Sequence, residues 1–173
     1  SRFFNAVAST GESPARLAAG FDSVTICLSK GLGCPAGALL AFESRHWEQA
    51  RRWKQCMGGS LRQSGMLAAA GLFALDHNLA SLAEDHSNAR RLAEGISGLK
   101  GIEVEDTAPS SNMVFFRLRS GIQPAAFSAL CESKGFRFSR VGDDRFRAVT
   151  HLDVSADEIN RVITGMKEIA AAL

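Results

Sequence analysis

Lys30 has the clearest chemical potential in this sequence, in the segment Leu28-Ser29-Lys30-Gly31-Leu32-Gly33. It follows an apolar stretch of strand length and precedes two closely spaced glycines, so we expect its amine in a partly desolvated turn. Desolvation disfavours the charged ammonium form, and a neutral amine can attack a carbonyl carbon. Ser29 can donate a hydrogen bond to a phosphate, and glycines let the backbone approach a bound molecule closely. The segment therefore indicates a Schiff-base lysine, with a solvated surface turn as the alternative.

The histidines and cysteines indicate no metal chemistry. Their positions show no metal-ligand spacing, so no metal site is predicted. His151 shares a strand face with Arg147 if the strand extends that far, but a hydrogen-bonded packing histidine is the favoured interpretation. The sequence has no CxxC pair, and Cys27 and Cys34 lie in an apolar stretch. This pattern is typical of reduced thiols, so we expect a cytoplasmic protein.

Alternating helical and strand patterns surround the lysine segment. Residues 2–8 are helix-like, and Ser13-Pro14 begins a short helix with a capping residue before proline. Residues 24–28 predict a strand buried on both faces, and residues 36–42 a second strand that returns beside it like a hairpin. A helix then runs from about residue 44 to Gly58-Gly59.

The rest of the chain predicts long helices followed by a small α+β layer. A helical region spans residues 61–97 with a break near His77-Asn78, and its start near Met66 is apolar nearly all round. We expect that start to be buried in the protein or against a partner subunit. After Gly101 we expect strands over 102–105, 113–118, 136–139 and 145–149, and helices over 124–133 and 155–173, the last with a Ser155–Glu158 capping box. The predicted class is α/β, with a first domain over residues 1–75 and a small α+β domain over 76–173.

Composition narrows the possible partners. The 173 residues carry 20 Lys+Arg and 18 Asp+Glu, a net charge of +2, and 46% are hydrophobic. These values exclude a disordered, collagen-like or coiled-coil chain. They give no electrostatic reason to expect nucleic acid or an anionic membrane as a partner. No apolar run approaches the roughly 20 residues of a membrane span, and the N-terminus lacks the apolar core of a signal peptide.

The stretch SVTICLSKGLGCPAGALL resembles the lysine segment of the low-specificity L-threonine aldolases, which are fold-type-I pyridoxal-phosphate (PLP) enzymes. The resemblance continues, in family order, through SRFFNA, MGGSLRQSGMLAAAGLFAL, LAEDHSNARRLAEGI, SSNMVFF and RAVTHLDVS. It implies that residues 1–75 are the remainder of an aspartate-aminotransferase-like, PLP-binding large domain that precedes the small domain. It also implies PLP as cofactor, an amino-acid substrate and assembly as a homodimer or homotetramer.

The resemblance assigns roles to four residues. Lys30 is implied to bind the cofactor covalently. Arg2 is implied to lie near the phenolic oxygen of the cofactor, and Arg62 to contact its phosphate across a subunit interface. Arg147 is implied to hold the substrate carboxylate. A guanidinium suits these roles because it stays charged and can donate two parallel hydrogen bonds to an anion.

The implied activity is retro-aldol cleavage of L-threonine or L-allo-threonine to glycine and an aldehyde, with PLP as the electron sink and Arg147 orienting the breaking bond. The sequence departs from the family at Gln55, where a basic residue is expected. The glycine/threonine turn, histidine and aspartate that the family places before SRFFNA are not in this sequence, so we expect it to be the rear half of a longer enzyme. The alternatives are another fold-type-I PLP lyase or transferase, a catalytically incomplete fragment, and a cofactor-free interaction module.

Overall fold

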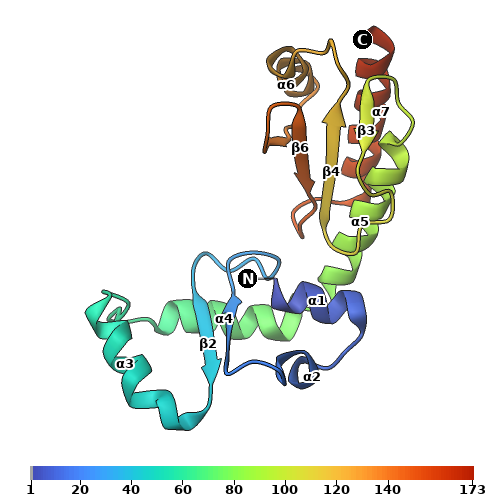
Figure 1. The fold of residues 1–173 in the computed structure, drawn as a ribbon. Coiled ribbons are helices and arrows are strands. Elements are labelled where there is room, and N and C mark those ends of the chain that lie inside the picture. The colour runs from blue at the N-terminus through green and yellow to red at the C-terminus, as the bar shows by residue number, and fades with distance from the viewer. Residues whose placement is uncertain (1) are drawn as a thin grey trace. The chain divides into compact units, whose positions relative to one another are not determined.

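The structure is a computed structural model that describes residues 2–173 (Figure 1). The chain forms two compact units, Ser1–Leu82 and Ala83–Leu173, each with its own sheet and its own hydrophobic core. The domain ranges predicted from the sequence, 1–75 and 76–173, stay a prediction.

The first unit contains a two-stranded antiparallel sheet and several helices. The helix α2 begins as predicted, because the Ser13 side chain accepts a hydrogen bond from the backbone N–H of Arg16 and Pro14 is the first helical residue. The strands pair in the predicted hairpin-like manner, with Thr25 opposite Leu40. The elements are α1 (Phe3–Thr10), α2 (Pro14–Ala18), β1 (Ser23–Cys27), β2 (Ala38–Phe42), η1 (Ser44–His46), α3 (Trp47–Cys56) and α4 (Gly65–His77).

Burial in the first unit differs from the prediction. The side chains of β1 are half-buried or exposed rather than buried on both faces, because the sheet has only two strands within residues 2–82. Most of the apolar stretch that starts α4 is exposed as well, with Met66 82% and Leu72 64% accessible. The prediction that this stretch is buried inside the chain is therefore wrong, and its burial against a partner subunit stays a prediction.

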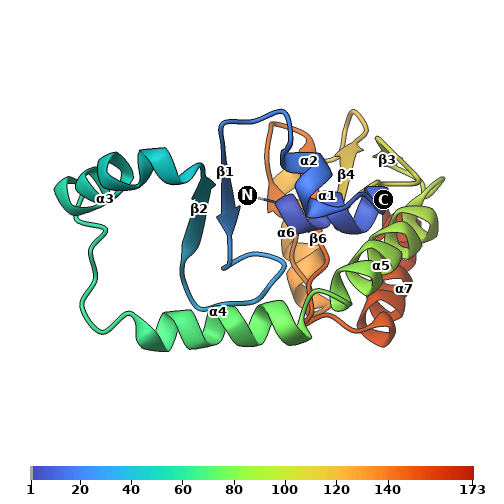
Figure 2. The same cartoon turned by 90° about the horizontal axis from the view of Figure 1, so that it is seen from below.

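The second unit packs helices against one face of a four-stranded antiparallel sheet of order β3-β4-β6-β5. Figures 1 and 2 both show α5 and α7 side by side. The predicted capping box is present: the Ser155 side chain accepts a hydrogen bond from the Glu158 backbone N–H, and the Glu158 carboxylate accepts one from the Ser155 backbone N–H. The elements are α5 (Ser81–Ile96), β3 (Ile102–Val104), β4 (Met113–Leu118), α6 (Pro124–Ser133), β5 (Ser139–Arg140), β6 (Arg145–Val149) and α7 (Ala156–Ala172).

One predicted strand is misplaced. Residues 136–139 are largely irregular, and β5 is limited to Ser139–Arg140. The backbone of Phe136 instead closes the end of α6, because its N–H donates to the carbonyl oxygen of Cys131 at 3.2 Å after Gly135 takes a positive φ of 85°. Apolar residues at 136 and 138 therefore pack on the core from a loop rather than from a strand.

Alternation along β4 and β6 separates the two faces of this sheet. Phe116 and Phe146 point into the core, where their rings stack with centroids 5.6 Å apart. The residues between them, including Phe115, Arg145 and Arg147, lie on the opposite face, called here the open face. The core beneath contains residues of α5, α6 and α7.

No single helix within residues 2–173 has both the length and the apolar composition of a membrane span. The pair α4 and α5 meets that test only when taken together, and the two helices are bent by 69°.

Candidate active site

Lys30 lies in a bend directly after β1 and is exposed. The turn is held by its own backbone, since the Gly33 N–H donates to the Lys30 carbonyl oxygen at 2.8 Å and the Cys34 N–H to that of Leu28 at 3.1 Å. Leu28 and Leu32, on either side, are buried in the small core of the first unit. The chain therefore presents the Lys30 amine from a fixed turn, but the desolvation expected from the sequence is not supplied by the described residues.

Gly31 brings this turn against α1 and against Leu82, the last residue of the first unit. A Cβ added at Gly31 would lie 2.7 Å from Cδ2 of Leu82 and 3.1 Å from Nδ2 of Asn5. Only glycine fits without displacing a neighbour. From the sequence we expected this glycine to let the backbone approach a bound molecule closely. In the structure, the absence of a side chain instead leaves room for Leu82 and Asn5.

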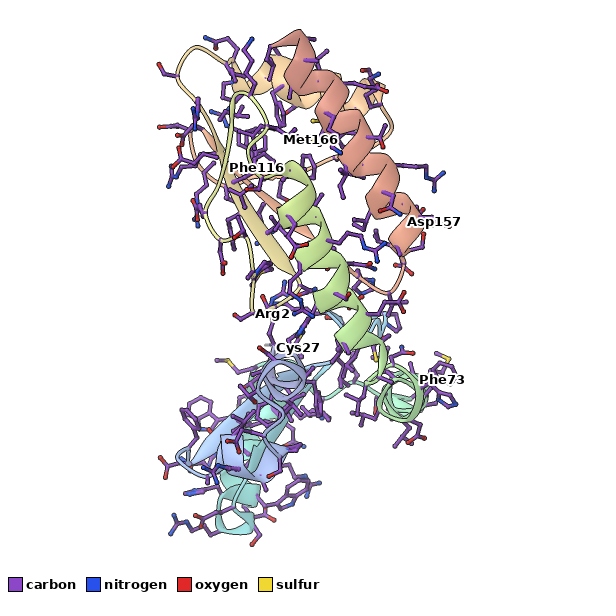
Figure 3. The ribbon with its side chains drawn as sticks, turned by 90° about the vertical axis from the view of Figure 1, so that its right-hand side faces the viewer. Arg2, Cys27, Phe73, Phe116, Asp157 and Met166 are labelled. Atoms are coloured by element: carbon purple, nitrogen blue, oxygen red, sulfur yellow. The ribbon has the colours of Figure 1, made fainter. Side chains whose placement is uncertain are left out.

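Arg2 and Cys27, which lie close together in Figure 3, line one small cavity of about 10 Å³ with Gly31. Arg2 occupies the position that precedes α1 and is half-buried. The structure therefore brings Arg2 to the turn that carries Lys30.

The Cys27 thiol is polarised by its neighbours. Its Sγ lies 3.4 Å from Oγ of Ser29. That side-chain hydrogen bond is the main reason why the pKa of Cys27 is lowered, and the nearby Lys30 charge lowers it further while partial burial opposes the shift. Ser29, which the sequence suggested as a phosphate donor, is thus in contact with a thiol of the same turn.

Arg62 lies in the segment between α3 and α4 and is exposed. It is followed by Gln63, whose φ of 51° is in the left-handed region. The predicted contact of Arg62 with a cofactor phosphate across an interface stays a prediction.

Arg147 belongs to the second unit, on the open face of its sheet. It pairs with Phe115 of β4 on one side and with Ser139 of β5 on the other. Its Nε atom is buried and has no hydrogen-bond partner within residues 2–173. An unmade bond at a buried donor costs free energy, so such a group marks a position where a ligand can bind.

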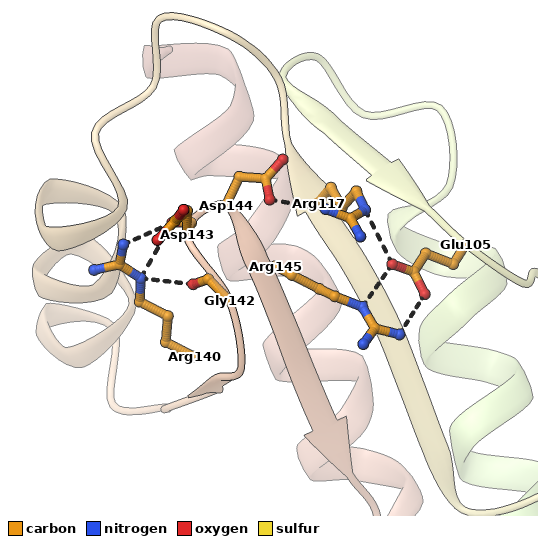
Figure 4. Close-up of polar contacts among 7 residues, drawn as sticks. All are labelled: Glu105, Arg117, Arg140, Gly142, Asp143, Asp144 and Arg145. Carbon is orange, nitrogen blue, oxygen red and sulfur yellow. Dashed lines mark hydrogen bonds and ion pairs between the residues drawn. The ribbon is translucent and has the colours of Figure 1, made fainter.

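The other two arginines of the open face are paired (Figure 4). Arg145 donates from Nε and Nη2 to the two carboxylate oxygens of Glu105, both at 2.7 Å. Arg117 lies 3.2 Å from the same carboxylate and donates to Asp144 at 2.9 Å. The hydrogen bonds from Arg145 are the main reason why the pKa of Glu105 is lowered. These two carboxylates are therefore bound by Arg117 and Arg145, not by Arg147.

A buried polar cluster at the end of β6 was not predicted. The Thr150 hydroxyl donates to the carbonyl oxygen of Asp85 at 2.6 Å, and Nδ2 of Asn112 donates to that of Thr150 at 2.6 Å. Asp85 Oδ2 is buried with no partner among residues 2–173, and burial raises its pKa. The sequence signal that could have revealed this cluster is a polar residue next to each apolar strand, Asn112 before β4 and Thr150 after β6.

His151 does not share a strand face with Arg147, because β6 ends at Val149. Its Nδ1 lies 3.3 Å from Oδ2 of Asp153. Within residues 2–173, no group of three or more His, Cys, Asp or Glu side chains is arranged to hold a metal ion.

Comparisons with known proteins identify relatives over most of this chain. It is 43% identical over 162 residues to the low specificity L-threonine aldolase of Escherichia coli O157:H7, and covers 46% of that protein. It is 35% identical over 165 residues to low-specificity L-threonine aldolase 1 of Arabidopsis thaliana, again covering 46%. The chain thus spans about half the length of these curated relatives.

Solved structures confirm the predicted fold class. A threonine aldolase of Leishmania major superposes with a TM-score of 0.73 at 19% identity, over 98% of this chain and 50% of the other. The chain thus has the α/β architecture of part of a fold-type-I large domain followed by a small α+β domain. The model of the beta-eliminating lyase family matches residues 1–119. This match, together with the aldolase relatives along nearly the whole chain, shows that the chain belongs to the beta-eliminating lyase family.

Proposed function

We propose that the protein to which this chain belongs is a PLP-dependent aldehyde-lyase that cleaves L-threonine and L-allo-threonine to glycine and an aldehyde. The proposal depends above all on Arg147, whose buried Nε has no partner among residues 2–173 although its arginine neighbours are paired. A guanidinium in this state suits the carboxylate of an amino acid. The names of the aldolase relatives support the substrate class.

The residues of the first unit fit PLP by their chemistry. Lys30 presents an exposed amine, which can bind an aldehyde covalently, from a turn held by backbone hydrogen bonds. Arg2 lies beside that turn, and Arg62 is exposed between α3 and α4. These two guanidiniums suit the phenolic oxygen and the phosphate, respectively. When bound, PLP supplies an electron sink for bond cleavage at the substrate Cα.

Within this scheme Arg147 has a positioning role toward the substrate. Two parallel hydrogen bonds from its guanidinium would hold the substrate carboxylate in one orientation. A fixed carboxylate sets the direction of the Cα–Cβ bond, which breaks as the 3-hydroxyl loses its proton and the aldehyde leaves. Substitution of Arg147 by lysine keeps the charge but loses the paired geometry, so it should raise KM for threonine more than it lowers kcat.

Addition of PLP to this 173-residue chain tests whether the chain by itself binds the cofactor covalently. A visible absorbance band, followed by borohydride reduction and peptide mass mapping to Lys30, would show covalent binding. Lys30→Ala should abolish the modification, and Lys54→Ala, another lysine of the first unit, should leave it unchanged. No modification of the parent chain would support the alternative of a catalytically incomplete fragment.

The reaction itself is tested with the protein expressed from its complete gene. We expect acetaldehyde and glycine from L-threonine and from L-allo-threonine without any added acyl donor. Glycine formed only in the presence of an acyl-CoA would instead indicate a 2-amino-3-ketobutyrate ligase.

We also propose that the protein is a cytoplasmic homodimer or homotetramer. The four cysteines are free, which is typical of a reducing compartment. Large apolar side chains of the first unit are exposed, among them Met57 at 80% and Leu72 at 64%, and a partner subunit would cover them. Analytical ultracentrifugation distinguishes these assemblies from a monomer.

A further inference from the structure

We propose that Glu105 is a positioning residue that sets substrate specificity on the open face of the second unit. It binds Arg145 and Arg117 and so leaves Arg147 as the open-face guanidinium available to a ligand carboxylate. The inference rests on the proposed function of Arg147. It predicts a site for substrates that carry one carboxylate and an uncharged side chain.

The first step is the crowding of positive charge on this face. Arg145 and Arg147 are two residues apart on β6, so their side chains leave the sheet on the same side. Arg117 of β4 lies directly opposite Arg145. Like charges directly opposite each other on adjacent strands repel, so the pair of Arg117 and Arg145 needs a carboxylate nearby.

Glu105 provides that carboxylate from a fixed backbone position. Its N–H donates to the carbonyl oxygen of Phe115 at 2.9 Å, which continues the pairing of β3 with β4 by one residue. Its side chain then accepts two hydrogen bonds from Arg145, and one carboxylate oxygen also faces Arg117. The Arg145 guanidinium lies over the Phe115 ring, 4.4 Å from the centroid. Arg145 is thus held by a bidentate ion pair and by a cation–π contact.

Arg147 is outside this network although it is next to it. Phe115, the ring that Arg145 covers, is the residue directly opposite Arg147 in the sheet. Glu103 is a further carboxylate on the open face, but it lies directly opposite Arg117 in the sheet and not beside Arg147. The buried Nε of Arg147 therefore remains without a partner among residues 2–173.

A hollow beside Phe115 gives Glu105 a second effect. This cavity of about 170 Å³ is also lined by Glu105, Met113, Ser110 and Ser111. Asp106 lines it as well, so a ligand side chain that enters it meets an apolar surface, two hydroxyls and two carboxylates. A second ligand carboxylate would be repelled by Glu105 and by Asp106. Arg145, the cation that would attract it, is already bound to Glu105, so Glu105 acts on this carboxylate both directly and through Arg145.

The test compares one-carboxylate and two-carboxylate substrates in the PLP-loaded protein expressed from its complete gene. The substrates are L-threonine and L-threo-3-hydroxyaspartate, whose cleavage gives glycine with acetaldehyde or with glyoxylate. Glu105→Gln should raise the ratio of kcat/KM for hydroxyaspartate to that for threonine by on the order of tenfold. The dissociation constants of glycine and L-aspartate, read from the absorbance of the bound cofactor, should shift in the same ratio.

Three further variants separate the proposed role from general effects. Asp144→Asn removes one negative charge from the same network but leaves the Glu105–Arg145 pair, so the ratio should stay within about twofold of the parent. Glu105→Gln with Arg145→Met removes the released cation and should restore the parent ratio. Arg145→Met alone frees Glu105 and should lower the ratio, so the proposal remains testable even if Glu105→Gln does not fold.

Two results would overturn the inference while the proposed function stands: an unchanged ratio in folded Glu105→Gln, or an equal shift in Asp144→Asn. A parent protein that neither cleaves threonine nor binds glycine would overturn the proposed function, and this inference with it.

Discussion

Replacement of Gly31 by alanine tests the packing that holds the turn of Lys30 in place. An added Cβ would lie 2.7 Å from Cδ2 of Leu82 and 3.1 Å from Nδ2 of Asn5. Carbon atoms pack at about 3.5–4.0 Å, so a neighbour or the turn has to move by about 1 Å. Leu82 is 1% exposed and Asn5 5% exposed, so neither side chain has open space to move into.

We expect Gly31→Ala to lower the free energy of unfolding by about 1–3 kcal/mol, the usual cost of overpacking. Gly65→Ala is the matched control, because nothing lies within 4 Å of its added Cβ and Gly65 begins α4. Alanine is favoured over glycine in a helix by up to about 1 kcal/mol. The control should therefore be as stable as the parent or slightly more stable.

Urea unfolding followed by circular dichroism measures both variants. Leu82→Ala alone should cost about 2–5 kcal/mol, since it empties a buried site. Combined with Gly31→Ala it should cost less than the sum by about 1–2 kcal/mol, because the shorter side chain leaves room for the new Cβ. A loss below about 0.5 kcal/mol for Gly31→Ala, or strict additivity of the pair, would refute the reasoning.

Three other predictions concern the second unit and the thiols. Thr150→Val removes the 2.6 Å bond to the carbonyl oxygen of Asp85 at nearly constant shape, and should lower the free energy of unfolding by about 1–3 kcal/mol, measured by the same urea assay. Because the pKa of Asp85 is raised in the folded protein, its contribution to the free energy of unfolding is fully present below the unfolded pKa near 3.8 and is lost as pH rises through the folded pKa. Asp85→Asn should remove this loss of stability with rising pH, which urea unfolding at several pH values would show. Iodoacetamide should label the exposed Cys56 and the half-buried Cys27, whose pKa is lowered, well before the buried Cys131, whose pKa is raised to about 12. Early labelling of Cys131 in the native protein would contradict the structure.

The local elements were predictable because their signals are short-range. The bounds of β4, α6 and β6 agree with the prediction, since alternation and a proline at the helix start need only neighbouring residues. The strand over 136–139 was wrong because apolar residues spaced two apart can also pack from a loop that closes a helix. Local pattern alone does not separate these two cases.

The candidate site was predictable only in part. The position of Lys30 after a strand follows from its segment, and the structure places Arg2 beside that turn. The sequence left open whether Lys30 is desolvated or lies in a solvated turn, because it reports the apolar character of β1 but not how many strands lie beside it.

The sequence by itself determined which residue types are available: a lysine in a glycine-rich turn, three guanidiniums suited to anions, and the alternation that puts Arg145 and Arg147 on one strand face. Only the tertiary structure decided which guanidiniums of the open face are bound to carboxylates and which is not. Glu105 is 40 residues from Arg145 along the chain, and Asp144 is 27 residues from Arg117. Such pairs form only when separate strands align in register, and no local pattern of charge records that alignment.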